Sequence, residues 1–218
     1  MAETIFSNGA IWPKSELNMI NDSLLAIGET PFAEGTIVDS LPPGTDGDTA
    51  KRMIRATMIE VQARGWYFNT DYYFPLVPDS LGFITMPPNA LRVDFGNTEF
   101  RHQYTIKNGK IYDYVHQTFV IEGTLHADVI WLVDYVELPP EAYAHIALRA
   151  ARKFQQKVIG STELDTFTTR DEIDSLTNLQ RRQLQSQDYR LGNRRVNTRI
   201  SNSALYEGLY GVKTRRGF

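Results

Sequence analysis

Residues 48–69 read DTAKRMIRATMIEVQARGWYFN, and this stretch decides how the chain folds. Asp48 can cap free amides at the start of a helix, and Gly65 supplies a left-handed exit at its end. The aromatic run at 66–68 follows without a linker, so we expect this helix to join a helical half to a β half. Its apolar face recurs with the 3.6-residue period and consists of Ala50, Met53, Ile54, Thr57, Met58 and Val61.

Two further helices are indicated on either side of this one. The spacing of leucine and isoleucine predicts a short helix over 15–27, which Gly28 ends. Pro140 suits the first turn of a helix over 140–159, because the missing amide hydrogen of proline is not needed there. The face of that second helix should carry Tyr143, Ile146, Ala147, Ala150, Phe154 and Val158.

A last helix is predicted from a capping box, in which Thr169 and Glu172 satisfy the first free amides. It should run to about Gln187. The apolar side chains expected to face inward are Ile173, Leu176 and Leu184.

Between 66 and 138 the apolar period changes from 3.6 to two, which is typical of strands. Alternation predicts strands around 72–76 and 83–85. Asn108-Gly109 predicts a tight hairpin between Tyr104–Lys107 and Lys110–Tyr114, because both central residues of that turn take positive φ. We also expect a second hairpin, which pairs 118–122 with 128–136. The strand within 128–136 is apolar on both faces and should therefore be buried on both.

These elements predict an α+β fold, a bundle of about four helices interrupted by an inserted antiparallel β region. The expected domains are a helical bundle over 15–65 and 139–187 and an inserted β domain over 66–138. An N-terminal arm should occupy 1–14, and an extended basic arm 188–218.

Charge is distributed unevenly along the 218 residues. Residues 189–218 carry seven basic side chains and one acidic, whereas the first 188 carry 16 basic and 25 acidic. The arm could be a solvated terminus or could bind an acidic protein surface or nucleic acid. With no cysteine, no leader-like start and no run of 18 apolar residues, we expect a soluble chain without a membrane partner. The predicted partner interface is Arg190, Arg194, Arg195, Arg199, Tyr206, Tyr210, Arg215 and Arg216.

Motifs for chemistry are sparse. The chain has no G-x-S-x-G elbow and no cysteine nucleophile, and the glycines before Lys51 lack phosphate-loop spacing. We therefore expect no enzyme, no catalytic residue, no cofactor and no metal. The histidines follow no ligand spacing; they are His102, His116, His126 and His145.

Two alternative functions stay open, a glycan hydrolase and a DNA-binding protein. A glycan hydrolase would need a pair of carboxylates, and candidates are Asp71, Asp79, Asp94, Glu99 and Asp113. Tyrosines 72, 73, 112 and 114 could stack on sugars or bases, although packing within a sheet is the simpler interpretation. A DNA-binding protein that uses the arginine-rich arm is the other alternative.

Four segments in order give a family resemblance: LNMINDSLLAIGETP at 17–31, RGWYFN at 64–69, YTIKNGKIYDY at 104–114 and VELPPEAYAHIALRAARKFQ at 136–155. Over roughly 17–160 the chain resembles the tail tubular protein A family, the head-to-tail adaptors or gatekeepers of short-tailed bacteriophages. The resemblance implies a virion tail protein with a helical bundle and a β domain.

The resemblance also implies partners. It predicts a ring of twelve subunits between the portal and the nozzle, which is tubular protein B, with tail fibres as further neighbours. Double-stranded DNA would pass along the axis without sequence-specific binding. We then assign the basic arm to the portal or a neighbouring subunit.

Overall fold

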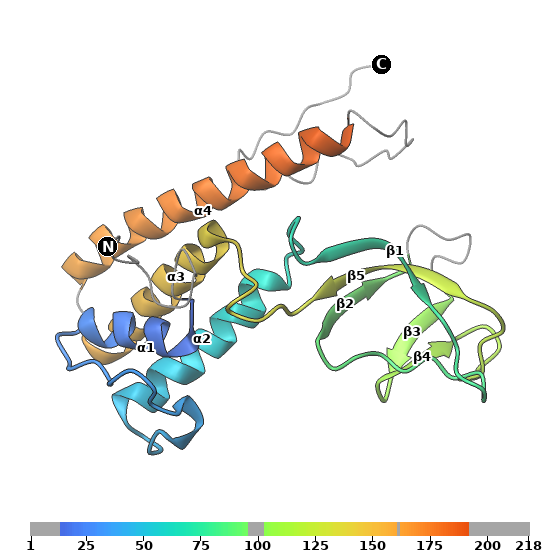
Figure 1. Cartoon of the computed structure of the whole chain (residues 1–218), viewed down its shortest axis with the longest axis horizontal. Helices are drawn as coiled ribbons and strands as arrows, with labels where there is room; N and C mark the ends of the chain where they lie inside the picture. The colour runs from blue at the N-terminus through green and yellow to red at the C-terminus, as the bar shows by residue number, and fades with distance from the viewer. Residues whose placement is uncertain (1–13, 96–102, 161, 192–218) are drawn as a thin grey trace, which may run out of the picture.

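The computed structural model describes residues 14–95, 103–160 and 162–191, and in the last helix it describes side chains for 168–186. Figure 1 shows helices gathered on one side of the molecule and strands on the other. The helices precede and follow a region of antiparallel strands, so the predicted α+β class is confirmed. The predicted arms lie outside the described residues, except for Lys14 and the stretch 188–191, which continues the last helix.

The central helix α2 spans Asp46–Gln62, and its buried face matches the predicted apolar face closely. Its start differs from the prediction. Thr45 is the N-cap, with its side chain accepting a hydrogen bond from the Asp48 amide at 3.3 Å. Asp48 lies in the first turn instead, where its carboxylate accepts from the Gly44 amide and pairs with cations. Gly65 has φ +78°, which confirms the left-handed exit.

Helix α1 spans Glu16–Leu25 and helix α3 spans Pro140–Val158. Both pack on α2. The Ser15 hydroxyl caps α1 by accepting a hydrogen bond from the Asn18 amide, and Pro140 occupies the first turn of α3 as predicted. The α3 face is largely confirmed, but Val158, the last residue of the helix, is 42% exposed. A short 3-10 helix η2, Val38–Ser40, lies in the connector before α2.

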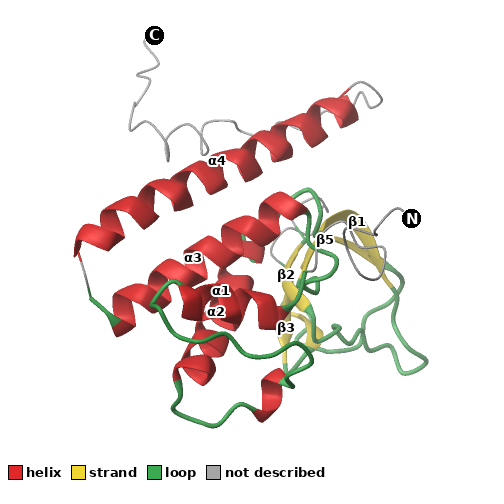
Figure 2. Ribbon diagram, turned by 60° about the vertical axis from the view of Figure 1, so that its left-hand side comes forward, coloured by secondary structure: helices red, strands yellow, loops and turns green. Residues whose placement is uncertain are grey.

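The last helix α4 spans Thr162–Leu191 and packs against α3 (Figures 1 and 2). The predicted capping box is wrong, since the helix begins seven residues before Thr169 and Glu172 pairs with arginines of α3 instead. Leu176 and Leu179 face the core. Ile173 and Leu184 are 57% and 61% exposed, so the prediction that they face inward is also wrong.

The strands are β1 Thr70–Leu76, β2 Ala90–Asp94, β3 Tyr104–Lys107, β4 Lys110–Asp113 and β5 Leu125–Trp131. β3 and β4 form the predicted hairpin, with Asn108 and Gly109 at φ +51° and +70°. The other strands form an antiparallel sheet in the order β1-β5-β2. Val129 and Ile130 of β5 are buried on its two faces, as predicted.

The predicted second hairpin is wrong, because β5 uses both of its edges to pair with β1 and β2. Residues 118–122 lie elsewhere: Thr118 bonds Asp113, and the Ile121 amide donates to the Gly82 carbonyl. Residues 83–85 form no named strand, and only Thr85 makes a bridge, to Lys110. The predicted strand end Val136 is 71% exposed, beyond the end of β5.

Two hydrophobic cores result. The helical core contains Ile20, Ile54, Ile146, Phe154 and Leu179, each fully buried. The β core lies between the three-stranded sheet and the β3–β4 hairpin, and its most buried members are Ile111 and Val129. The boundaries of the predicted domains, as folding units, stay a prediction.

A hydrogen-bonded junction joins the two regions. The Gln62 side chain donates to the Val133 carbonyl at 3.0 Å and accepts from the Val133 amide at 2.9 Å. Asn69 donates to the carbonyls of Gln62 and Trp131. Gly65 has no room for a side chain, because a Cβ there would lie 2.7 Å from Ile130. Side-chain amides thus connect the end of α2 directly to the β5 exit.

Candidate interaction surface

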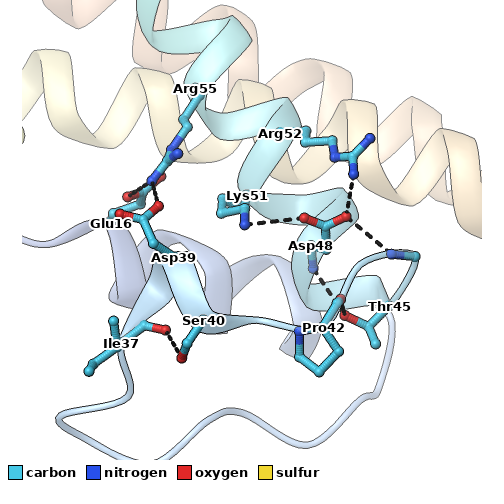
Figure 3. Close-up of polar contacts among 11 residues, drawn as sticks. Glu16, Ile37, Asp39, Ser40, Pro42, Thr45, Asp48, Lys51, Arg52 and Arg55 are labelled. Carbon is cyan, nitrogen blue, oxygen red and sulfur yellow. Dashed lines mark hydrogen bonds and ion pairs between the residues drawn. The ribbon is translucent and has the colours of Figure 1, made fainter.

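A cluster of charged residues fastens the connector to the first half of α2 (Figure 3). Arg55 forms a bidentate pair with Glu16 at 2.6 and 3.0 Å and also bonds Asp39 at 2.7 Å. The hydrogen bonds that Arg55 donates, first to Glu16 and then to Asp39, raise the pKa of Arg55, and the one to Asp39 lowers the pKa of that carboxyl. Each of these charged groups has a partner of opposite charge, so the cluster has a structural role.

The N-terminal turn of α2 is organised by Asp48. Its carboxylate accepts from Gly44 at 3.2 Å and pairs with Lys51 and Arg52 at 3.2 and 2.7 Å (Figure 3). The Gly44 amide is the main reason that the pKa of Asp48 is lowered. A hollow of about 220 Å³ lies beside it, lined in part by Arg52 and Lys157. That volume is below the roughly 300 to 1,000 Å³ of ordinary ligand pockets.

A second charged cluster ties α2, α3 and α4 together. Arg149 bonds Glu60 at 2.6 Å and also Glu172, and Arg152 bonds Glu172 at 2.8 Å. Lys153 bonds the other oxygen of Glu60, and this hydrogen bond is the largest cause of the low Glu60 pKa, about 2. The cluster therefore adds charged contacts to the apolar packing of the long α4 helix on α3.

A buried histidine extends that contact. His145 of α3 lies 2.9 Å from the Ser175 hydroxyl of α4. Because that hydroxyl donates to the Glu172 carbonyl, it can only accept from the histidine ring. Burial disfavours the charged ring and lowers the pKa of His145 to about 4, so the ring is neutral at physiological pH.

The β region ends in two loops that carry exposed apolar side chains. In the first, one Asp79 oxygen accepts from the amides of Leu81 and Phe83, both at 2.9 Å. In the second, Asp113 accepts from the amides of Val115 and His116 at 2.8 and 3.0 Å. We define the tip patch as five residues of these loops that are about half to 70% exposed: Val77, Leu81, Tyr114, Val115 and Val120.

The family model of the tail tubular proteins matches residues 17–189 of the chain. The chain belongs to the tail tubular protein family. The match covers the helices, the strands and the junction between them. The chain is thus a structural component of a bacteriophage tail. The tail tubular proteins are not a family of enzymes. No curated protein matches the chain.

Carboxylates considered for the glycan-hydrolase alternative have structural hydrogen-bond partners. Asp71 accepts from the Trp131 indole at 2.8 Å, and Asp79 and Asp113 cap the two tip loops. Burial would raise the pKa of Asp113, but hydrogen bonds from His116, Gln103 and Val115 outweigh it and hold the pKa at about 2. Such a group is a poor general acid at neutral pH. Asp94 ends β2, and Glu99 lies outside the described residues.

The histidines have ordinary structural surroundings in this family member. His116 bonds Asp113, His126 stacks on Tyr73, and His145 bonds Ser175. His102 lies outside the described residues. Within the described part of the chain, no three acidic or histidine side chains gather as a metal site would require. None of the helices in that part is both long enough and apolar enough to cross a lipid bilayer.

The tyrosines considered for stacking on sugars or bases lie in two separate groups. Tyr73 stacks on His126 with ring centres 4.0 Å apart, whereas Tyr112 packs edge-on against Tyr114 and Phe119. The predicted arm interface remains a prediction, because its side chains lie outside those that the structure describes: Arg190, Arg194, Arg195, Arg199, Tyr206, Tyr210, Arg215 and Arg216. Sequence reasoning missed the tip patch, although an Asp two residues before Leu81 and before Val115 is a recognisable turn signal.

Proposed function

We propose that this tail protein is an adaptor subunit that forms a ring, expected to have twelve copies, between the portal and the tail nozzle. The observation that carries the proposal is the family match over 17–189, which spans both the helical and the β region. An axial spacer needs a fixed geometry between its two ends, and the Gln62–Val133 junction supplies a rigid connection. Tail fibres would attach to the assembled ring.

DNA would pass through the centre of this ring. A lining rich in lysine and arginine would release counterions and hold the phosphates, so a sliding channel is better served by an acidic or neutral lining. The first 188 residues have a net charge of −9, which suits that requirement. A mapped channel dominated by arginine and lysine would contradict this part of the proposal.

The basic arm would dock on the portal or on a neighbouring subunit. Residues 189–218 have a net charge of +6, and an arm of this composition gains order when it binds an acidic surface. Deletion of residues 192–218 should leave a folded protein that fails to join portal-bearing heads. The measurement is electron microscopy of the variant mixed with those heads, and unimpaired joining would remove the arm from the proposal.

A matched pair of full-length variants tests whether docking depends on the charge of the arm and not only on its presence. Substitution of Arg194, Arg195, Arg199, Arg215 and Arg216 by Gln should abolish joining, whereas substitution by Lys should preserve much of it, because docking is expected to depend on charge. Direct DNA binding by the isolated protein with a steep salt dependence would instead favour a nucleic-acid-binding role for the arm.

A further inference from the structure

The outer side of α4 carries apolar side chains that the rest of the subunit leaves in solvent. Ile173 and Leu184 are 57% and 61% exposed, whereas Leu176 and Leu179 of the same helix face the helical core. Figures 1 and 2 show α4 along the edge of the molecule, with α3 on one side of it. The helix therefore has one side that packs within the subunit and another that is open to a partner.

The two exposed residues belong to one stripe along the helix. Ile173, Thr177, Gln180 and Leu184 follow one another at spacings of four, three and four, so they are neighbours on the helix surface. This alternating spacing is the one by which two helices pack along each other in a coiled coil. The Thr177 hydroxyl donates to the Ile173 carbonyl at 2.8 Å, so it already has a partner within the helix. We call these four residues the α4 stripe.

Charges beside the α4 stripe select the direction of a partner helix. Asp174 and Arg181 are exposed and follow Ile173 and Gln180 directly, so both lie along the same flank. Within the described part of the chain, neither side chain is held in an ion pair. If a second α4 packs antiparallel, Ile173 of one copy lies beside Leu184 of the other, and Asp174 lies beside Arg181. A parallel copy would instead place like charges together.

We propose that two copies of this chain pair through the α4 stripe, with their helices antiparallel about a two-fold axis midway between Ile173 and Leu184. The symmetry repeats the contact between Asp174 and Arg181 twice. A two-fold contact uses the same surface on both copies and closes at two subunits, whereas neighbours in a ring meet through unlike surfaces. The pair is therefore a state of the protein outside the ring, and the inference does not depend on the proposed adaptor function.

The pair should be weak and reversible. From Ile173 to Leu184 the stripe covers about 16 Å of helix, at a rise of about 1.5 Å per residue. A contact of that length falls below the roughly 800 Å² that each partner contributes to a stable complex. We therefore expect the pair to form in concentrated solution and to separate on dilution, so that dilute unfolding measurements report on single subunits.

Charge reversal on the purified full-length chain tests the pair. The variants are Asp174→Arg, Arg181→Asp and the two combined. The matched control is Asp171→Arg, which makes the same change at an exposed position of α4 that lies off the stripe. Sedimentation equilibrium over a range of protein concentrations measures the pairing, and circular dichroism checks that each variant keeps its helices.

We expect the unmodified chain and the control to reach twice the subunit mass as the concentration rises. Each single reversal should weaken pairing about five- to tenfold, because the two-fold axis repeats the repulsion. Pairing should return in the combined variant and in an equal mixture of the two single variants, since both arrangements restore opposite charges. An unmodified chain that never pairs, pairing that ignores the reversals, or a mixture that fails to recover would each overturn the inference.

Thiol cross-linking tests the direction of the helices independently of charge. The chain contains no cysteine, so an introduced thiol has no competitor. On mild oxidation, Ile173→Cys mixed with Leu184→Cys should form a disulfide between copies. Ile173→Cys alone should not, because antiparallel helices hold the two copies of residue 173 about 16 Å apart, beyond disulfide reach. Cross-linking of that variant with itself would indicate a parallel pair and overturn the inference.

Ring formation and portal joining, followed by electron microscopy, separate this inference from the proposed function. Both should persist in the charge variants, because the α4 stripe is assigned to the pair and not to the ring. Loss of rings in the single reversals would place the stripe between ring neighbours and overturn the inference. If the unmodified chain forms no ring, the adaptor proposal fails while the pair is still measured by sedimentation.

Discussion

The helical region and the β region use their apolar residues in opposite ways. The helices bury Ile146, Phe154 and Leu179 completely and add a charged cluster that ties α4 to its neighbours. The β region has the smaller core and uses two aspartates to hold Leu81 and Val115 in solvent. The difference indicates that the helices contribute most of the stability, while the β region presents exposed apolar side chains on loops capped by aspartates.

A cavity in the helical core should have the largest effect on stability. Phe154→Ala removes a fully buried ring, and we expect the free energy of unfolding to fall by about 3 to 5 kcal/mol. Leu184→Ala on the exposed side of α4 is the control and should change it by less than about 0.5 kcal/mol. Urea unfolding followed by circular dichroism measures both. Equal effects would mean that the outer side of α4 is covered in solution.

Acidification should weaken the helical region before the β region. An unfolded histidine takes up a proton near pH 6.5, but folded His145 does so only near pH 4. Between these values the unfolded chain binds more protons, so stability is lost as the pH falls from about 6.5 to about 4. The charged groups that face this ring are Glu172, Arg149, Arg64 and Glu60.

Carboxylates contribute in a lower window. Glu60 has a pKa of about 2 against 4.5 when unpaired, so its contribution is present above pH 4.5 and is lost as the pH falls toward 2. In the β region Asp113 behaves in the same way between about 3.8 and 2. His145→Asn keeps a donor for Ser175 and should flatten the slope between pH 6.5 and 4. An unchanged slope in unfolding titrations of that variant would contradict the assignment.

The smallest effect is expected at Tyr73. Its φ of +57° lies in the left-handed region, which costs about 1 to 2 kcal/mol for a residue with a side chain, while its stack on His126 returns about 0.5 to 1.5 kcal/mol. Tyr73→Gly should therefore leave the free energy of unfolding within about 1 kcal/mol. Tyr72→Gly has no such strain to relieve and should be the more harmful change. The reverse order in urea unfolding would show that the backbone at Tyr73 is unstrained.

Local signals in the sequence predicted local structure well. The Asn108-Gly109 turn and the Gly65 exit depend on backbone preferences of single residues, and the buried face of α2 depends on spacing within one helix. Apart from the cap of α2, which is Thr45 and not Asp48, the errors came from choices between distant partners. Nothing in residues 118–122 shows that β1 and β2 occupy both edges of β5, and nothing in α4 shows that only one side of it meets α3.

The candidate site was predictable only in part. The uneven charge pointed to the basic arm, whose role stays a prediction. The tip patch required knowledge of Gly82 lying against Val120, a contact between segments almost forty residues apart. Glu172 was mispredicted for the same reason. Its position in the sequence suggested a helix cap, but its carboxylate pairs with two arginines of α3.

The junction at Gln62 has a mechanical consequence. When a tail is anchored at one end of this molecule and pulled at the other, the load must pass through the stretch where α2 meets the exit of β5. There the paired hydrogen bonds between the Gln62 side chain and Val133 would share the tension, and Ile130 lies too close to Gly65 to leave room for a side chain. The subunit should therefore resist bending at this junction under load, and a Gln62→Ala variant should bend there more easily.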